Sequence, residues 1–483
     1  MPRPASGGAT ARRRPRPAQH RRTPSASART TPPRISPLEA LLDTAAAQPA
    51  PPPRDFAQLG LPAPLVTTLA RRGFTAPFAI QTRALPDALA GRDVLGRAQT
   101  GSGKTLAFGL AVIARLHSGR RPKLPTAPRA LVLAPTRELA NQVAEELAPL
   151  AHSLDLRVAP VYGGAPMGRQ IDRLRRGVDI LVATPGRLQD LIDQRVATLA
   201  HIEITVLDEA DHMADLGFMP AVTKLLDMTP AGGQRLLFSA TLDRGVERLA
   251  QRYLTDPAAH AVALSRAAVD TMDHRVFAVK AEDKVAVASA IAARPARSLF
   301  FVRTKHGADR LAKQLSRAGA DAVAIHGNLN QNQRERALRA FMTGHSRVLV
   351  ATDVAARGIH VDDVDLVVHF DPPSDHKDYL HRSGRTARAG ATGTVLSLVE
   401  PAQLRSVEKL HEQAAVTTTT SRVDHVGHAD VLELASSGEP IVVEGPPPGA
   451  VRGPKPARRP RPAGSGAGNV GRGRGRERER RRA

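Results

Sequence analysis

The sequence predicts an α/β protein with two tandem domains, each a parallel sheet covered by helices on both faces. From about residue 54, short apolar runs of strand length alternate with helical patterns, and the alternation pauses near residues 258–273 before it resumes. Such alternation is typical of parallel sheets with helical crossovers. The chain has 483 residues, which is too long for one ordinary domain and enough for two or three.

The apolar runs give the expected strands. In the first half these include residues 94–95, 130–134, 180–183, 204–207 and 236–238. In the second half they are residues 276–279, 299–302, 323–325, 348–351, 366–370 and 394–398. Between two strands of the first half, one helical pattern places Leu139, Val143, Leu147 and Leu150 on a single face.

Composition sets the expected domain boundaries. Residues 1–53 form a basic tail rich in Pro, Ala and Arg, and we expect it to be disordered because it cannot bury a core. The first domain is expected at residues 54–262, a linker at 263–273 and the second domain at 274–414. A low-complexity basic tail is expected at 415–483, and its part before residue 446 is ambiguous.

The formal net charge of +23 is concentrated at the two ends of the chain. Residues 1–51 hold nine Arg against two acids, and residues 446–483 hold eleven Arg and one Lys against two acids. Basic tails on a less charged core are typical of arms that bind polyanions, and the alternative is a solvated Arg-rich end. The chain has no cysteine, which excludes disulfides. It also lacks a long apolar run or a signal-peptide core, so we expect a cytoplasmic protein.

A Gly-rich segment lies between the first predicted strand and a helical pattern. Glycines there let backbone N–H groups converge on a phosphate, and the helix N-terminus adds positive partial charge. Lys104 is expected to reach the β- and γ-phosphates of a nucleotide, and the Thr105 hydroxyl to ligate Mg²⁺. The predicted nucleotide-binding residues of this loop are Ala98, where the general template has Gly, and Gln99, Thr100, Gly101, Ser102, Gly103, Lys104 and Thr105.

Three carboxylates follow the strand expected at residues 204–207. Acids at the end of a strand suit a site at the carboxyl edge of a parallel sheet. Asp208 is expected to hold Mg²⁺, usually through water, and Glu209 to polarise the water that attacks the phosphate. The alternative is a solvated acidic turn, which the phosphate loop upstream disfavours.

Residues 98–105 and the run Asp208-Glu209-Ala210-Asp211 together resemble the bacterial type of the DEAD-box ATP-dependent RNA helicase family. Further motifs extend the resemblance over about residues 54–410. The resemblance implies two RecA-like domains that use ATP and Mg²⁺ and bind RNA across both domains, with the basic tails as auxiliary contacts. It also implies an RNA-stimulated ATP hydrolase that couples ATP binding and hydrolysis to local unwinding or remodelling of RNA duplexes and ribonucleoproteins.

Residues 73–81 resemble the Q motif of this family. The Gln81 amide can donate to an adenine edge and accept from it at once, which selects adenine. In the family an upstream aromatic ring stacks on the base, and Phe56 lies at the expected distance along this chain. Phe78 and Ala79 depart from the usual Thr and Pro.

Several segments resemble those that contact RNA in the family. Each offers backbone N–H groups, hydroxyls or Arg, which suit a phosphodiester backbone. The expected contacts are Pro135, Thr136, Arg137, Gly164, Thr184, Pro185, Gly186 and Arg187 in the first half, and Arg303, Arg334 and Thr352 in the second.

A further set of residues resembles the family motifs that couple hydrolysis to strand separation. Ser239 and Thr241 are expected to bond through their hydroxyls to the acids near Asp211, and His381 and Arg382 to belong to the same coupling. In the second half, Asp353 is expected to accept from the ribose of ATP, and Arg385 and Arg388 to act as arginine fingers on the γ-phosphate. His360, Ser383 and Ala387 depart from the family's usual Asp, Ile and Gly.

By this assignment, the first domain binds ATP and lacks the fingers, whereas the second domain has the fingers and no phosphate loop. Hydrolysis therefore requires the two domains to meet, and ATP and RNA should bind cooperatively. Two alternatives stay open: an RNA-annealing chaperone or ATP-locked RNA clamp that uses the tails, and a DNA helicase.

Overall fold

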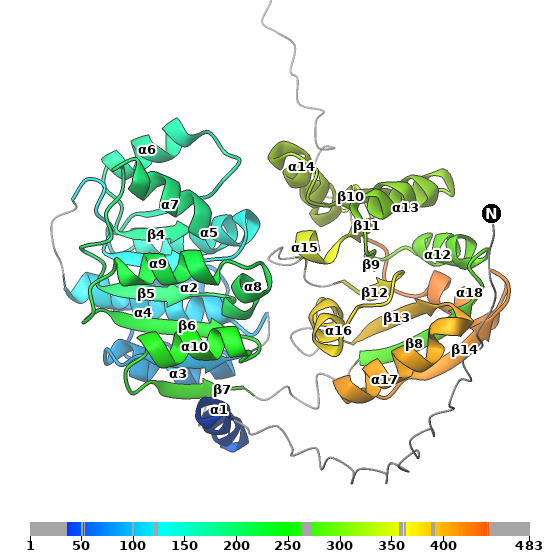
Figure 1. The fold of residues 1–483 in the computed structure, drawn as a ribbon, viewed down its shortest axis with the longest axis horizontal. Coiled ribbons are helices and arrows are strands. Elements are labelled where there is room, and N and C mark those ends of the chain that lie inside the picture. The colour runs from blue at the N-terminus through cyan, green and yellow to red at the C-terminus, as the bar shows by residue number, and fades with distance from the viewer. Residues whose placement is uncertain are drawn as a thin grey trace, which may run out of the picture.

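The protein consists of two α/β domains that follow each other along the chain, as the computed structural model in Figure 1 shows. The structure describes residues 36–49, 52, 54–98, 101–119, 124–262, 272–356, 361, 364–387, 392–441 and 443. In each domain one sheet lies between two layers of helices. Every strand pair within the two sheets is parallel, which confirms the predicted α/β class.

The first domain is built on a seven-stranded sheet in the order β3-β4-β2-β5-β6-β1-β7. Its strands are β1 Val94–Arg97, β2 Ala130–Leu133, β3 Val158–Val161, β4 Ile180–Ala183, β5 Ile204–Leu207, β6 Gln234–Ser239 and β7 Ala258–Ala261. Consecutive residues of β5 face opposite sides, because Val206 belongs to one buried cluster and Leu207 to the other. Both faces of the sheet are therefore covered by helices. For this reason the central strands are continuous runs of apolar residues.

Two helical layers enclose this sheet. Helices α2 Ala63–Arg71, α3 Ala79–Leu89, α4 Lys104–Ser118 and α5 Arg137–His152 pack in the cluster on one face. Helices α1 Pro37–Ala47, α6 Met167–Arg175, α7 Pro185–Asp193, α8 Ala210–Asp215, α9 Met219–Asp227 and α10 Arg244–Tyr253 pack in the cluster on the other. Short polar side chains begin several of these helices: Thr136 accepts from the Leu139 amide, and Asp243 from the Val246 amide.

The first domain begins earlier than the composition indicated. Helix α1 lies within the expected disordered tail of residues 1–53, yet it packs beside β7 with Leu42 buried. Arg83 holds its C-terminal end by donating to the carbonyl oxygens of Ala45 at 3.2 Å and Gln48 at 2.7 Å. The helix was missed because it is a short apolar segment between Pro-rich stretches and buries only Leu42 and Ala45. Strand β7 also falls where the alternation was expected to pause.

The second domain repeats the same strand order. Its sheet runs β10-β11-β9-β12-β13-β8-β14, which is the order of the first sheet shifted by seven. The strands are β8 Met272–Val279, β9 Ser298–Phe301, β10 Ala322–Ile325, β11 Val348–Ala351, β12 Leu366–His369, β13 Gly393–Val399 and β14 Thr419–Val423. The helices are α12 Lys284–Ala292, α13 Lys305–Arg317, α14 Gln331–Met342, α15 Asp353–Ala356, α16 His376–Ser383, η1 Pro401–Gln403, α17 Leu404–Ala414 and α18 Ala429–Ser436.

The second domain also extends beyond its expected end at residue 414. Strand β14 pairs with β8 at the edge of the sheet, and α18 packs against α12 with Val431 and Leu434 buried. The sequence signal was weak because β14 is a largely exposed edge strand in which four of the five residues are polar or charged. The linker also ends before its expected last residue, 273, because Met272 already belongs to β8.

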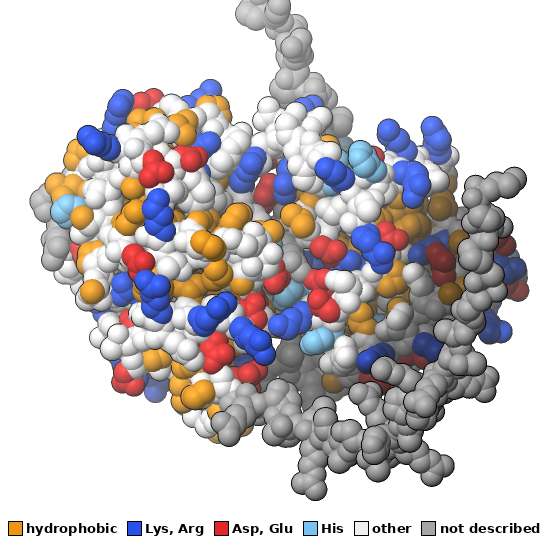
Figure 2. Space-filling model, in the orientation of Figure 1, with side chains coloured by type: hydrophobic (Ala, Val, Ile, Leu, Met, Phe, Trp, Pro, Cys, Tyr) orange, Lys and Arg blue, Asp and Glu red, His pale blue; other side chains and the backbone are white. Residues whose placement is uncertain are grey.

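The two domains meet along a seam where charged side chains gather, as Figure 2 shows. Helices α14, α15 and α16 lie on the side of the second domain that faces the first. No helix in the described part of the chain is long and apolar enough to span a membrane.

Candidate active site and nucleic-acid interface

The Gly-rich loop connects β1 to α4, which begins at Lys104. Gly101 and Gly103 both have a φ of 83°, which favours glycine over other residues. A Cβ on Gly103 would lie 2.4 Å from Gln81 Nε2, so glycine is also required for space. Gln99 and Thr100 lie outside the described residues.

Lys104 folds back onto its own loop. Its Nζ donates to the Ala98 carbonyl oxygen at 2.6 Å, and the residue is buried. Ser102 and Thr105 flank it at the N-terminus of α4, a helix end that favours the binding of an anion.

The Q-motif residues pack directly on this loop. Gln81 is fully buried: its Nε2 donates to the Gly103 carbonyl oxygen at 3.0 Å, and its Oε1 accepts from the Phe78 amide at 2.9 Å. An amide has a second hydrogen and a second lone pair beyond these two bonds. Phe56 is 3% exposed and lies in the core, whereas Phe78 is 47% exposed. Stacking of Phe56 on a base and adenine reading by Gln81 stay predictions.

The acids follow β5 at the carboxyl edge of the first sheet. Asp208 is buried, and burial together with the neighbouring Glu209 raises its pKa to about 7. Burial also tends to raise the pKa of Glu209. That tendency is outweighed by the hydrogen bond and charge of His212 and by the charges of Lys104 and Arg385, which bring the pKa to about 2. One carboxyl is thus held ionised beside another that protonates readily.

His212 is a residue of this site that the sequence reasoning missed. Its Nδ1 lies 3.2 Å from Glu209 Oε2. The signal available in the sequence was the spacing of three residues at the start of a helix, which places the two side chains one turn apart.

Asp211 links the acidic turn to the end of β6. Its Oδ2 accepts from the Thr241 hydroxyl at 3.0 Å and from the Thr241 amide at 2.9 Å. Ser239 behaves differently from the expectation, because its hydroxyl accepts from the Asp211 amide at 3.2 Å rather than donating to a carboxylate. The three residues form one connected network in which the acid has little freedom to move.

Helix α16 of the second domain and the turn that follows it bring basic groups to this acidic edge. His381 and Arg385 line a cavity of about 30 Å³ together with Lys104 and Glu209 of the first domain. The preceding Arg382 points back into its own domain, where its Nε and a terminal nitrogen donate to the two Asp353 oxygens at 2.6 and 2.8 Å. Arg388 and His360 lie outside the described residues.

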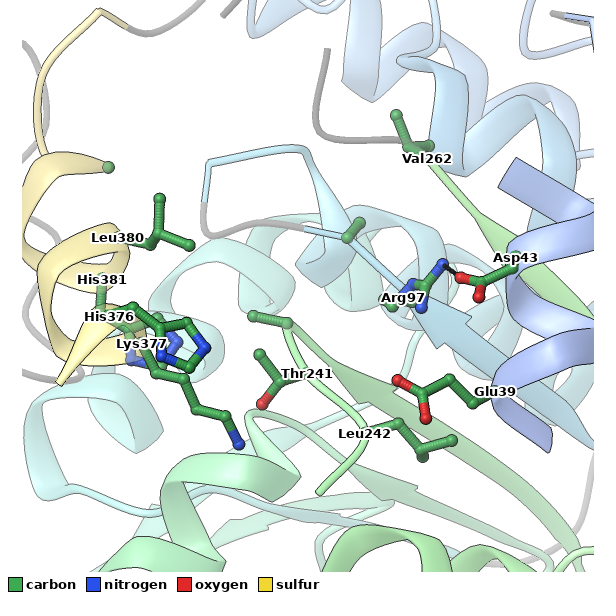
Figure 3. Close-up of a pocket in the computed structure, with 13 residues that line it drawn as sticks. Glu39, Asp43, Arg97, Thr241, Leu242, Val262, His376, Lys377, Leu380 and His381 are labelled. Atoms are coloured by element: carbon green, nitrogen blue, oxygen red, sulfur yellow. Dashed lines mark hydrogen bonds and ion pairs between the residues drawn. The ribbon is translucent and has the colours of Figure 1, made fainter. Parts of the chain in front are cut away.

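A larger cavity of about 440 Å³ adjoins this small one and shares Ala240 and His381 with it (Figure 3). One of its walls carries Asp43 of α1, paired at 2.6 Å with Arg97 at the end of β1. Lys377 of α16 lines the opposite wall. The helix missed by the sequence reasoning therefore forms part of the boundary between the domains.

The expected RNA segments of the first domain converge on one place. They follow β2, β3 and β4, which are neighbours at one end of the sheet. Arg137 packs so closely on Gly164 that a Cβ there would lie 2.0 Å from the guanidinium, and Gly164 has a φ of 78°. Arg187 donates to the Ala165 carbonyl oxygen at 3.2 Å. Thr184 is buried at the start of α7, and Pro185 and Gly186 are the first two residues of that helix. Pro135 and Thr136 directly precede α5.

The second domain presents its expected RNA residues at the matching end of its sheet. Arg303 follows β9 and is exposed, and Thr352 follows β11 and is buried. Arg334 on α14 forms an ion pair with Glu138 on α5, with Nε and Oε1 2.9 Å apart. This pair joins the two domains beside the segments that are expected to contact RNA.

A phosphate loop and paired acids on one sheet, completed by arginine from a second sheet of the same topology, define a two-domain nucleotide hydrolase. The DEAD/DEAH box helicase model matches residues 78–249, and the helicase conserved C-terminal domain model matches residues 283–390.

Known proteins resemble the chain over most of its length. The DEAD-box ATP-dependent RNA helicase CshA of Bacillus subtilis is 37% identical over 394 residues, which cover 80% of this chain and 77% of that protein. The RNA helicase CrhR of Synechocystis is 42% identical and covers 76% of this chain and 75% of that protein. The structure of S. cerevisiae Dbp5 bound to RNA and ADP BeF3 aligns with a TM-score of 0.68 at 29% identity, over 79% of this chain and 98% of that one. The chain therefore belongs to the DEAD-box ATP-dependent RNA helicases, and its two domains are RecA-like.

Proposed function

We propose that this protein hydrolyses ATP when RNA is bound and uses the cycle to unwind or remodel RNA locally. One observation carries the proposal: Arg385 of the second domain lines the same cavity as Lys104 and Glu209 of the first. Neither domain holds all three groups, so the arrangement requires the domains to be together. The division of these three groups between the domains supports an enzyme that is active only when the two domains are closed together.

The residues around Asp208 fit a magnesium ion. Three crowded carboxyls, one of them with its pKa raised to about 7, favour a cation nearby. No cluster in the described part of the chain can hold a metal by protein ligands alone. Magnesium typically takes one or two carboxylates and completes its shell with phosphates and water, and when bound it neutralises phosphate charge. We propose Asp208 and the Thr105 hydroxyl as its protein contacts.

Each remaining group has a distinct proposed role. Lys104 leaves the Ala98 carbonyl to contact the phosphates, and Glu209, held ionised, orients the attacking water. Arg385 stabilises the charge that develops during phosphoryl transfer, and we propose that Arg388 joins it. The cavity of about 30 Å³ has room for a water molecule but not for a triphosphate, so we propose that nucleotide binding moves Lys104.

We propose that a single RNA strand lies along the ends of β2, β3 and β4 and continues past β9, β10 and β11. Arg137, Arg187 and Arg303 supply charge for the phosphodiester backbone. The Glu138–Arg334 pair spans the two halves of this path, so RNA bound on both sides favours the closed state. Closure on one strand bends it and displaces its partner, which gives local unwinding.

We further propose that the two domains span residues 36–262 and 272–441, with the basic tails as auxiliary RNA contacts. The tails lie outside the described residues, and so does most of the expected linker. A truncation that tests the tails should remove residues 1–35 and 444–483, because removing residues up to 51 would delete α1. RNA binding should then depend less on salt. The slope of the logarithm of the binding constant against the logarithm of the salt concentration should become shallower by about 0.7 for each phosphate contact that is lost. The cytoplasmic location stays a prediction.

The test is ATP hydrolysis and strand separation by the full chain, with and without RNA. Arg385→Ala should lower RNA-stimulated turnover by about 10³-fold or more, the value of arginine fingers in related enzymes. The matched control is Arg405→Ala, because Arg405 is an exposed arginine on α17 that lines neither of the two cavities between the domains. Turnover that ignores RNA, or that survives Arg385→Ala, would contradict the proposal. Activation by single-stranded DNA equal to that by RNA would favour a DNA helicase instead.

A further inference from the structure

The side chain of Glu209 starts from a backbone conformation that non-glycine residues rarely adopt. Its φ of 49° and ψ of 53° are left-handed, and the residue is the N-cap of α8. His212 is therefore the third residue of that helix and lies one turn further along, above the carboxylate. This geometry places an imidazole where it can hold the carboxylate from one side.

The contact between the two side chains is buried and fixes the protonation of the ring. Nδ1 of His212 lies 3.2 Å from Oε2 of Glu209, and the side chains are 6% and 12% exposed. An ionised carboxylate can only accept a hydrogen bond, so Nδ1 must carry the hydrogen. In the neutral ring Nε2 is then an acceptor, and this buried atom has no hydrogen-bond partner among the described residues.

We propose that His212 is a positioning residue for hydrolysis. It holds Oε2 of Glu209 through Nδ1, so that Oε1 stays directed at the attacking water. His212 lines the small cavity together with Lys104 and Arg385, so it faces the place where the reaction would occur. The role rests on the proposed ATP hydrolysis and assigns to it a residue outside the motifs recognised in the sequence.

Two observations distinguish positioning from simple packing. The first is the unsatisfied Nε2, which costs free energy that an apolar side chain of similar size would not cost. The second is the position of the ring, because His212 lines the small cavity beside Lys104, Glu209 and Arg385. A residue that only filled space would show neither feature.

The test compares His212→Leu with His212→Asn in the full chain. Leu keeps most of the volume and removes the donor, whereas the Asn amide nitrogen occupies the position of Nδ1. His212→Leu should lower the RNA-stimulated kcat by about 10- to 100-fold, as expected for a lost hydrogen bond to a charged group. The KM for ATP should change by no more than about twofold, since the contact does not bind substrate. His212→Asn should recover kcat to within about threefold of the wild type.

Several outcomes would overturn the positioning role. These are a wild-type kcat in His212→Leu, an Asn variant as slow as the Leu variant, or a defect that appears in KM alone. Thermal melting reports whether each variant folds. If His212→Leu melts early, His212→Gln replaces it, because its amide occupies the Nε2 position and should not restore kcat. A wild-type chain without RNA-stimulated hydrolysis would contradict the proposed function itself, which separates the two failures.

Discussion

The two domains have the same strand order, yet their first strands lead into different chemistry. In the first domain β1 is followed by a glycine loop, and α4 begins at the buried Lys104. In the second domain β8 is followed by residues 280–283, which include no glycine, and α12 begins at the buried Lys284. The Lys284 Nζ lies 4.9 Å from the centre of the Phe370 ring, and burial lowers its pKa. A lysine at the equivalent position therefore serves packing in one domain and, by our proposal, phosphate in the other.

Other equivalent strands carry complementary groups. The acids of the first domain follow β5, and α16, with Arg385 in the turn after it, follows β12, the equivalent strand of the second domain. The proposed RNA contacts follow β2, β3 and β4 in one domain and β9, β10 and β11 in the other. By our proposal, repetition of the fold extends one RNA path over both domains, whereas the hydrolytic site is divided between them. This division makes hydrolysis depend on closure.

The sharpest test of this contrast substitutes the two equivalent lysines. Lys104→Met should lower ATP turnover by about 10³-fold or more, because the phosphates lose a charge-assisted contact. Lys284→Met keeps the apolar stem over Phe370 and should leave the KM for ATP unchanged. Steady-state ATPase assays with saturating RNA measure both. A comparable loss in Lys284→Met, in protein that melts like the wild type, would show that the second domain also binds phosphate.

A smaller effect is expected from the ion pair between the domains. Reversing one charge, as in Glu138→Arg or Arg334→Glu, should raise the RNA concentration for half-maximal ATPase by about tenfold, because like charges then oppose closure. The double reversal should restore most of the loss. The control is Arg336→Glu, which alters an exposed arginine on the same helix. Single and double variants that bind RNA equally well would exclude this pair from closure.

The smallest effect concerns acid stability, and it differs between the two domains. His274, His369 and His411 are buried in the second domain, and burial lowers the pKa of each, that of His411 to about 4. The unfolded chain binds protons at these sites more readily, so their contribution to stability is lost as pH falls from 6.5 toward 4. The pKa of Asp208 is raised from 3.8 to about 7, so its protonation adds stability to the first domain over the same range. This gain opposes the loss from His260, the histidine of the first domain whose pKa burial lowers.

Hydrogen exchange at pH 7 and pH 5, corrected for the intrinsic rates, measures this difference. Amides of the second sheet should lose protection relative to those of the first in the nucleotide-free chain. In His411→Phe the relative loss should be smaller, because one titrating group is gone. Parallel loss of protection in both sheets would contradict the assignment.

The sequence predicted the parts of the structure that have strong local signals. Central strands such as 204–207 are continuous apolar runs, because both faces of the sheet are covered, and they were placed correctly. Strand β14 and helix α1 were missed, because a largely exposed edge strand and a short helix bury few residues. Their stability comes from tertiary contacts such as those of Arg83 with the end of α1, which no local pattern reveals.

For the site, motifs predicted which residues would be close together but not how they would bond. Thr241 bonds to Asp211 as expected, whereas Ser239 accepts a bond instead of donating one. His212 was missed because a histidine at the start of a helix has no distinctive signature until Glu209 is placed beside it. The bidentate pair of Asp353 with Arg382 was also unexpected, since it joins two motifs that are distant in sequence.

The central claim is that the divided site is completed by closure, and the distance between the domains tests it directly. The chain has no cysteine, so Arg175→Cys on α6 and Arg317→Cys on α13 provide two exposed sites for a fluorescent donor and acceptor. Energy transfer is measured without ligand, with a non-hydrolysable ATP analogue, with RNA, and with both. The account predicts one distinct closed state that is well populated only with both ligands. The same transfer efficiency in all four conditions, or full closure with the ATP analogue alone, would contradict it.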